Sequence, residues 1–216
     1  MTRKNRMIPL AVALTTALTT SAAHAEFTFH AGFFSDYILD GASASDNNAV
    51  VQGGVGYDFA SGSYAGVFMS TLGDGNGQEL TPYFGHVLYL GAHEIDFGYA
   101  YLHFSELDDA DNGEVHLAVS RGPLTAVVSH VLNADDSDSV GNSELALGFE
   151  HHFDRHNRLE LEVGHILHAD SDEDDLTYWA LGLARDAGDG TISLTYASTD
   201  ENGSQNLFVA GYSVSF

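Results

Sequence analysis

The sequence predicts an all-β protein: residues 26–216 form a twelve-stranded antiparallel transmembrane β-barrel, after a cleaved signal peptide of residues 1–25. Three observations predict this fold. Segments of about ten residues alternate apolar with polar or small residues, which is the period of a β-strand. Long and short connections alternate between these segments. No segment beyond residue 25 is apolar enough for a transmembrane helix, and in lipid only helices and closed barrels satisfy every backbone hydrogen bond.

The first 25 residues have the pattern of an export signal. Three basic residues lie within the first six positions, residues 7–20 are mostly apolar, and Ala23-His24-Ala25 places small residues where signal peptidase cleaves. The apolar stretch is about 13 residues long, shorter than the roughly 20 that a spanning helix needs. We therefore expect cleavage and export through the periplasm rather than a retained membrane anchor.

The composition of residues 26–216 excludes several classes of protein. This part has 31 acidic and four basic residues, a net charge of −27, and it contains no lysine. Such a surface repels nucleic acid, so we expect no nucleic-acid partner. The chain contains no cysteine, which excludes disulfides and thiol chemistry.

The strands are clearest where one face is apolar and the other is polar or small. Residues 51–59, 94–101, 144–153 and 159–164 show this alternation. The stretches 64–72, 80–90 and 123–132 are apolar on both faces. Their inward and outward residues therefore cannot be assigned from the pattern.

The connections separate the barrel from a soluble β-sandwich. We expect six long connections near residues 40–48, 73–79, 105–113, 133–142, 169–175 and 199–205. Five short ones alternate with them at residues 60–63, 91–93, 121–123, 154–157 and 186–190. Eleven connections make twelve strands, an even number that leaves both ends on one side. Outer-membrane barrels pair short periplasmic turns with longer external loops, whereas a sandwich does not require this sorting.

Charge follows the same division. The four arginines beyond residue 25 lie in or next to short turns: Arg121, Arg155, Arg158 and Arg185. The long connections hold 18 of the 31 acidic residues, and the densest cluster is Asp170, Asp172, Glu173, Asp174 and Asp175. This cluster lacks the glycine and the distant glutamate of a calcium-binding loop, so a solvated acidic external loop is favoured over a weak Ca²⁺ site.

The last strand carries an apolar face that ends in an aromatic residue. Tyr212, Val214 and Phe216 alternate along it and therefore share one face. This pattern resembles the signal by which barrel-assembly machinery recognises its substrates. Outer-membrane lipid and that machinery are therefore expected partners.

Residues 35–104 carry motifs of a known family. The motifs include Ser35-Asp36-Tyr37, Gly41, Ser45-Asp46-Asn47, Val51-Gln52-Gly53-Gly54, Ser61-Gly62-Ser63-Tyr64-Ala65-Gly66-Val67 and Asp96-Phe97-Gly98-Tyr99. This part resembles the TorF-type porin family, small outer-membrane β-barrels of Gram-negative bacteria. The family usually has an arginine before the glycine, where this chain has Asp40. The resemblance implies a porin-like protein, and Asp40 implies a stronger preference for cations than in its relatives.

The histidines and serines do not form a recognisable catalytic or metal-binding motif. His151 and His152 are adjacent, so on a strand they point to opposite faces and cannot chelate one ion together. Ser129 and His130 diverge for the same reason. We therefore expect no metal, no cofactor and no enzymatic activity.

The inward face carries the functional prediction. Ten small residues are expected to point inward: Gly32, Gly54, Gly56, Gly98, Ala100, Ala118, Gly148, Gly164, Ala180 and Gly182. They either leave room for water or only help the sheet to curve. The expected pore-lining charged residues are Asp58, Glu94, Asp96, Glu144, Glu150, Glu160 and Glu162, with Arg158 near one mouth. Carboxylates without partners require a hydrated interior, and rings of acidic side chains are typical of cation channels.

The sequence therefore predicts an outer-membrane channel for passive diffusion of small solutes, with a preference for cations. Two alternatives stay open. A closed structural or adhesive barrel with acidic external loops is favoured if Tyr64, Phe68 and Tyr178 turn inward. A membrane-embedded hydrolase is favoured if a tight Ser–His or Asp–His pair lies at the outer rim.

Overall fold

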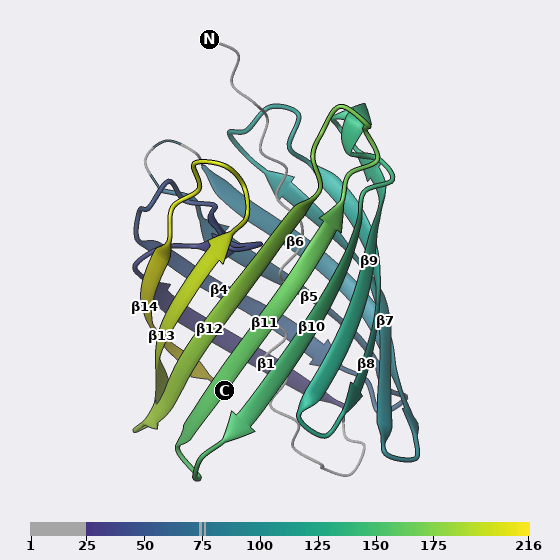
Figure 1. Ribbon diagram of the computed structural model, residues 1–216. Coiled ribbons are helices and arrows are strands. Elements are labelled where there is room, and N and C mark those ends of the chain that lie inside the picture. The colour runs from purple at the N-terminus through teal and green to yellow at the C-terminus, as the bar shows by residue number, and fades with distance from the viewer. Residues whose placement is uncertain (1–24, 74, 76) are drawn as a thin grey trace.

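The computed structural model describes residues 25–73, 75 and 77–216, and it confirms the twelve-stranded antiparallel barrel (Figure 1). The barrel strands are β1 (Glu26–Phe34), β4 (Val50–Asp58), β5 (Ser63–Thr71), β6 (Gln78–Leu90), β7 (His93–Phe104), β8 (Asn112–Arg121), β9 (Leu124–Ala134), β10 (Ser143–His152), β11 (Asn157–Leu167), β12 (Leu176–Ala187), β13 (Gly190–Thr199) and β14 (Leu207–Ser215). The predicted signal peptide lies outside the described residues except for Ala25.

Each barrel strand pairs with its neighbours in the chain, and β1 pairs with β14 to close the cylinder. The long and short connections fall where the alternation predicts them. In Figure 1 the long connections lie together at the upper end and the short turns at the lower end. Phe29 and Phe216 exchange backbone hydrogen bonds, so the start of β1 and the end of β14 both lie at the turn-bearing end.

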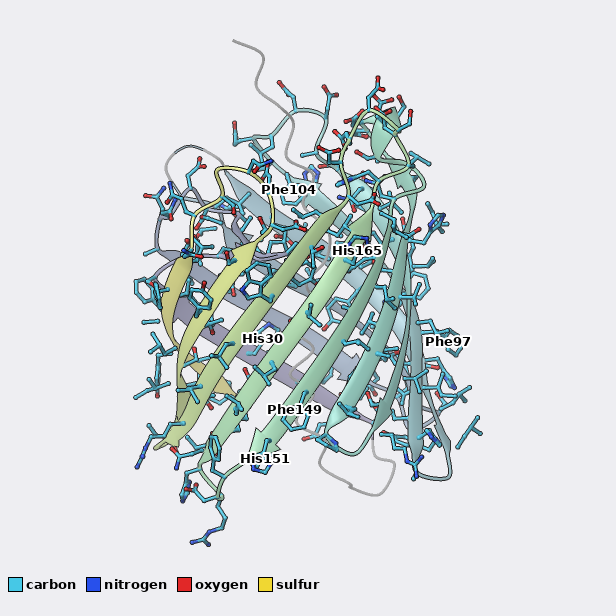
Figure 2. The ribbon with its side chains drawn as sticks, viewed as in Figure 1. His30, Phe97, Phe104, Phe149, His151 and His165 are labelled. Carbon is cyan, nitrogen blue, oxygen red and sulfur yellow. The ribbon has the colours of Figure 1, made fainter. Side chains whose placement is uncertain are left out.

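The outer face of the barrel is apolar. Leu145, Leu147, Leu161 and Val163 on β10 and β11 are exposed, and Phe97 on β7 projects outward in Figure 2. Only the 3₁₀ turn η1 (Ser137–Ser139) is helical in the described chain, and no helix there is long and apolar enough to span a membrane. A cylinder with an apolar exterior and every edge paired is compatible with lipid.

Aromatic rings gather at the turn-bearing end of the outer face. The ring centroids of Phe27 and Tyr57 are 4.7 Å apart, and those of Tyr57 and Phe59 are also 4.7 Å apart. His151 and Phe153 form a similar pair at 5.4 Å. Such a belt is typical of the interfacial aromatic girdle of outer-membrane barrels.

The first long connection, residues 35–49, folds into the barrel and is called loop 1 below. It contains a small hairpin, β2 (Ile38–Leu39) paired with β3 (Ala42–Ser43), which the sequence pattern does not predict. The loop packs in a buried apolar cluster made of Tyr37, Leu39, Val50, Leu72, Ala100, Leu102 and Phe104. Ala100, Leu102 and Phe104 lie on the inner face of β7, so loop 1 occupies the interior at the loop-bearing end.

Candidate functional site: the barrel interior

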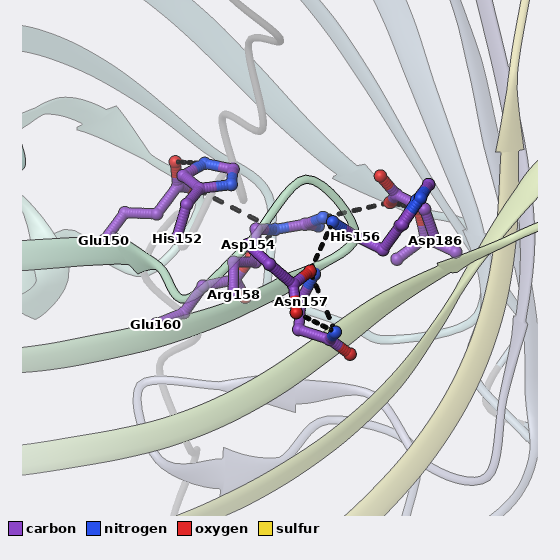
Figure 3. Close-up of polar contacts among 9 residues, drawn as sticks. Glu150, His152, Asp154, His156, Asn157, Arg158, Glu160 and Asp186 are labelled. Carbon is purple, nitrogen blue, oxygen red and sulfur yellow. Dashed lines mark hydrogen bonds and ion pairs between the residues drawn. The ribbon is translucent and has the colours of Figure 1, made fainter.

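The inner mouth at the turn-bearing end is organised around Arg158 on β11 (Figure 3). Its Nε lies 2.6 Å from Oε1 of Glu160 and 3.8 Å from Oε2 of Glu150, and its Nη1 lies 3.5 Å from Oδ1 of Asp186. His152 Nε2 lies 2.9 Å from Oε1 of Glu150. The single guanidinium group of Arg158 therefore contacts three carboxylates at this mouth.

Asp186 belongs to this group, but the sequence pattern assigned it to a short turn. Its position could have been found by extending the β12 alternation, because Asp186 shares a face with Ala180, Gly182 and Ala184. Because the predicted short connection began at residue 186, Asp186 was not among the predicted pore-lining residues.

The four glutamates expected along one wall of β10 and β11 divide into two groups. Glu150 and Glu160 face one another across the strand pair next to Arg158. Glu144 and Glu162 lie nearer the loop-bearing end, where the hydroxyl of Tyr178 on β12 contacts both of them, the second at 3.0 Å. The two groups therefore occupy different depths of the interior and have different partners.

Loop 1 adds an acidic residue to the second group. Asp40 is only 3% exposed, and neither of its carboxylate oxygens has a hydrogen-bond partner among the described residues. Burial raises its pKa well above the usual value, and the charges of Glu144, Glu114 and Glu162 raise that pKa further. We call Asp40, Glu114, Glu144 and Glu162 the acidic cage.

Two members of the cage, Asp40 and Glu114, are absent from the predicted pore-lining residues. Asp40 and also Glu79 were counted among the acidic residues of the long connections, yet both are buried inside the barrel. The expected external rim is therefore less negative than the sequence count implies. Glu114 could have been found, because it shares the inward face of β8 with His116 and Ala118.

The other predicted pore-lining carboxylates lie on other parts of the wall, on β4 and β7. Asp96 on β7 accepts a 2.8 Å hydrogen bond from the hydroxyl of Tyr64, and its second oxygen lies 3.6 Å from Nε2 of His116. Asp58 is exposed at the turn-bearing end of β4, and Glu94 lies on β7 near the same end. The interior therefore carries acidic groups on β4, β7, β8, β10 and β11.

The inward glycines and the large inward side chains form cross-strand pairs. Gly54 faces His30, Gly66 faces Tyr83, Gly85 faces Tyr64, Gly98 faces His116, and Gly164 faces Tyr178. A Cβ placed on Gly98 would lie 2.7 Å from Cε1 of His116, and the other four would meet their partner side chains at similar or shorter distances. Gly54, Gly98 and Gly164 belong to the ten small residues expected to leave room for water or to help the sheet curve, and at these three positions a neighbouring side chain fills the space.

Tyr64, Phe68 and Tyr178 all turn inward, which is the arrangement expected of a closed barrel. The rings of Tyr64 and Tyr178 cover glycines on the adjacent strand and so lie against the wall. The ring centroid of Phe68 instead lies 6.2 Å from that of His30 and 6.4 Å from that of Tyr37 in loop 1. Loop 1 and Phe68 therefore occupy part of the interior at the loop-bearing end.

The predicted acidic loop lies between β11 and β12. This connection lies at the loop-bearing end, where Figure 2 shows many side-chain oxygens. Its acidic residues are Asp170, Asp172, Glu173, Asp174 and Asp175. The backbone N–H of Asp172 donates to Asp170, and the backbone N–H of His168 donates to Asp175. In the described part of the chain, no cluster of three or more potential ligand side chains could hold a metal ion.

The three residues of the expected assembly signal lie at the end of β14. Tyr212 and Phe216 are exposed on the outer face at the turn-bearing end, with Val214 between them on the same side. Their recognition by assembly machinery stays a prediction.

Two pairs at the loop-bearing end bear on the hydrolase alternative. His103 Nδ1 lies 2.6 Å from Asp111, and His130 Nδ1 lies 2.8 Å from the hydroxyl of Ser143. A serine nucleophile needs a base that is itself oriented by a third group. Both pairs are of the kind that favours the hydrolase alternative, but in the residues that the structure describes no acidic side chain contacts His130, so the Ser143–His130 pair has no such third group.

Solved porin structures share this fold. A KdgM porin superposes with a TM-score of 0.63 at 9% identity, covering 88% of this chain and 99% of that chain. The KdgM porin in complex with disordered oligogalacturonate gives 0.60 at 9% identity, covering 88% and 98%. A NanC porin gives 0.54 at 12% identity, covering 88% and 98%. At these identities the likeness shows the fold alone.

The sequence comparisons show the family but not an activity. No curated protein matches the chain, and the TorF-type name is not confirmed. The model of the Gcw_chp family, described as bacterial proteins of unknown function, matches residues 18–215. The chain therefore belongs to the Gcw_chp family.

Proposed function

We propose that this protein is an outer-membrane channel through which small solutes diffuse passively, with a preference for cations. The observation that carries the proposal is the charge of the barrel interior. Its walls and loop 1 present many carboxylates, whereas Arg158 is the only arginine in the described chain that contacts an acidic side chain. Carboxylates that line a pore attract cations and repel anions.

The outer surface supports placement in the outer membrane. The exterior is apolar, the turn-bearing end has an aromatic belt, and the long acidic connections lie at the opposite end. In bacterial barrels of this kind the short turns are periplasmic and the longer loops external. Export by residues 1–25 and insertion by barrel-assembly machinery complete the proposed route.

The solute class differs from that of one structural neighbour. The KdgM porin was solved with oligogalacturonate, a chain of acidic sugars. The interior of this barrel, with the acidic cage and the carboxylates around Arg158, would repel such a polyanion. Similarity of fold therefore does not extend to that solute.

A closed structural or adhesive barrel is the second candidate, because loop 1 and Phe68 fill part of the interior. Osmotic swelling of proteoliposomes distinguishes the two. A channel lets small amines and neutral solutes enter and swell the vesicles, and it admits polyanionic oligosaccharides more slowly. Vesicles that contain folded barrel but swell no faster than empty ones would favour the closed barrel.

A further inference from the structure

The carboxylate of Asp40 is buried among groups of its own charge. Asp40 has φ of 47°, and the following Gly41 has φ of 73°, so the tip of loop 1 turns in the left-handed region. A Cβ on Gly41 would lie 2.9 Å from Cβ of Tyr178 and would also overlap the carbonyl of Ser198. The tip is thus wedged against β12 and β13, which holds Asp40 toward the three glutamates of the cage.

Hydrogen bonding within the cage leaves a charge uncompensated. A tyrosine hydroxyl has one proton, yet Tyr178 contacts both Glu144 and Glu162. The hydroxyl of Ser129 donates to Glu144 at 3.2 Å. Neither oxygen of Asp40 accepts a hydrogen bond in the described chain, so these donors cannot neutralise the cage.

Buried carboxyls that lie near one another are stable only when protonated or when paired with a cation. An unpaired carboxylate in a low-dielectric site costs several kcal/mol unless it is protonated or paired with a cation. The charged groups that act on Asp40 are the glutamates Glu144, Glu114 and Glu162, and Arg158 contacts Glu150, Glu160 and Asp186 at a different depth. Where these carboxyls are ionised, no basic side chain in the described chain acts on Asp40, so a cation from outside the chain would be the counter-charge.

We propose that the acidic cage binds an organic cation that carries an ammonium or guanidinium group. The proposal rests on the proposed channel function and deepens it, because it names the class of solute that the pore concentrates. Ammonium and guanidinium groups present several N–H donors to separate acceptors, which suits carboxyls contributed by loop 1, β8, β10 and β11. The cage does not have the arrangement of a metal site, which disfavours a bare metal ion.

Isothermal titration calorimetry on the folded full-length barrel in detergent tests the site directly. The probes are methylguanidinium chloride and ethylammonium chloride, compared with KCl and CaCl₂ at matched ionic strength. We expect the organic cations to bind more tightly than K⁺ or Ca²⁺. Asp40→Asn and Glu162→Gln should each weaken that binding about tenfold, the loss expected for one charge-assisted hydrogen bond.

The control is Asp172→Asn, which removes the same charge from the external loop and should leave binding unchanged. Asparagine tolerates the left-handed backbone at position 40, and heat-modifiable gel migration establishes that each variant is folded. Binding that is absent between pH 6 and pH 9, equal for K⁺ or Ca²⁺, or unaffected by Asp40→Asn would overturn the proposal.

Failure of the site and failure of the channel give different results. If the barrel conducts K⁺ in a planar bilayer but does not bind the organic probes, the proposed binding site is wrong and the proposed channel function stands. If the barrel binds the probes through Asp40 but conducts no ion, the proposed channel function is wrong and the proposed binding site stands. Both measurements use the same preparation.

Discussion

Gly164 and Tyr178 illustrate how single residues shape the interior. They face one another across β11 and β12, and the tyrosine ring covers the glycine. Glycine in a strand weakens the strand, but an aromatic ring from the neighbouring strand compensates by packing over it. The ring stays on the wall, so its hydroxyl reaches Glu144 and Glu162.

Gly164→Ala tests this pairing. The new methyl group would overlap the Tyr178 ring and displace it, at a cost of roughly 1–3 kcal/mol. Gly148→Ala is the matched control, because a Cβ at Gly148 would meet Thr125 Cβ at 3.9 Å, an ordinary contact. Urea unfolding in detergent should show a lower midpoint for Gly164→Ala than for Gly148→Ala. Equal midpoints would contradict the account.

Asp40 makes a second prediction at this scale. Its pKa is higher in the folded barrel than in the unfolded chain, so the folded state retains a proton that the unfolded state releases. This aspartate therefore lowers the free energy of unfolding as pH rises above the unfolded pKa of about 4. Asp40→Asn removes the effect.

In amine-free buffer, Asp40→Asn should raise the urea midpoint above that of the wild type at pH 8. The gain should be roughly 1–3 kcal/mol, because a neutral amide replaces a carboxyl whose charged form is unfavourable in a buried site beside glutamates. The difference should disappear near pH 4, because the aspartate is then protonated in the folded barrel and at its midpoint in the unfolded chain. A variant that is less stable than the wild type at pH 8 contradicts the buried, unpartnered state of Asp40.

Loop 1 is the element that occupies the interior at the loop-bearing end. It inserts into the loop-bearing end and packs against the inner face of β7, and its tip is wedged against β12 and β13 at Gly41. The sequence pattern predicts the loop's position in the chain, but its hairpin spans only two residues per strand. The apolar run from Tyr37 to Leu39 indicates that part of the loop is buried, but strands of two residues are too short for an alternation pattern to predict them.

Gly41→Ala should release the tip of loop 1. The substitution combines an unfavourable positive φ with overlap against Ser198 and Tyr178. Gly203→Ala is the control, because Gly203 also has a positive φ, of 88°, but a methyl group there would have no neighbouring atom within 4 Å. Single-channel conductance should increase for Gly41→Ala and stay at the wild-type value for Gly203→Ala. An unchanged conductance in both would show that loop 1 does not limit the pore.

The strands show where sequence reasoning succeeds and where it stops. On β10 and β11, leucines and glutamates alternate, and the structure places the leucines outward. On β5, Tyr64 and Phe68 point inward although both are aromatic, because Tyr64 contacts Asp96 and Phe68 packs near His30. These contacts depend on how the strands are aligned, which the alternation pattern does not give. Polarity therefore predicts a face only where the two faces differ in polarity.

At the scale of the whole molecule, charge is divided along the barrel axis. Arg121, Arg155, Arg158 and Arg185 all lie at or next to the short turns, and the acidic loop with Asp172 lies at the other end. This division was predictable because loop lengths and charges are both readable along the chain. The depth of Asp40 was not, because it depends on how loop 1 packs in three dimensions.

Protease treatment of intact cells tests the orientation. The connection that contains Asp172 should be cleaved from outside, since long loops of outer-membrane barrels are external. The turn that contains Arg155 should be cleaved only after the outer membrane is opened. Mass spectrometry of the fragments identifies the sites, and cleavage near Arg155 in intact cells would invert the proposed orientation.

The central claim is that the acidic interior conducts cations in preference to anions. The most direct measurement is the reversal potential of the purified barrel in a planar bilayer under a KCl gradient. We expect the sign of a potassium-selective pore, with weaker selectivity at high salt because an open interior is screened over about 10 Å at 0.1 M. Replacing Glu160 and Glu162 by glutamine should move the potential toward zero. An anion-selective reversal potential, or a double variant with unchanged selectivity, would contradict the account.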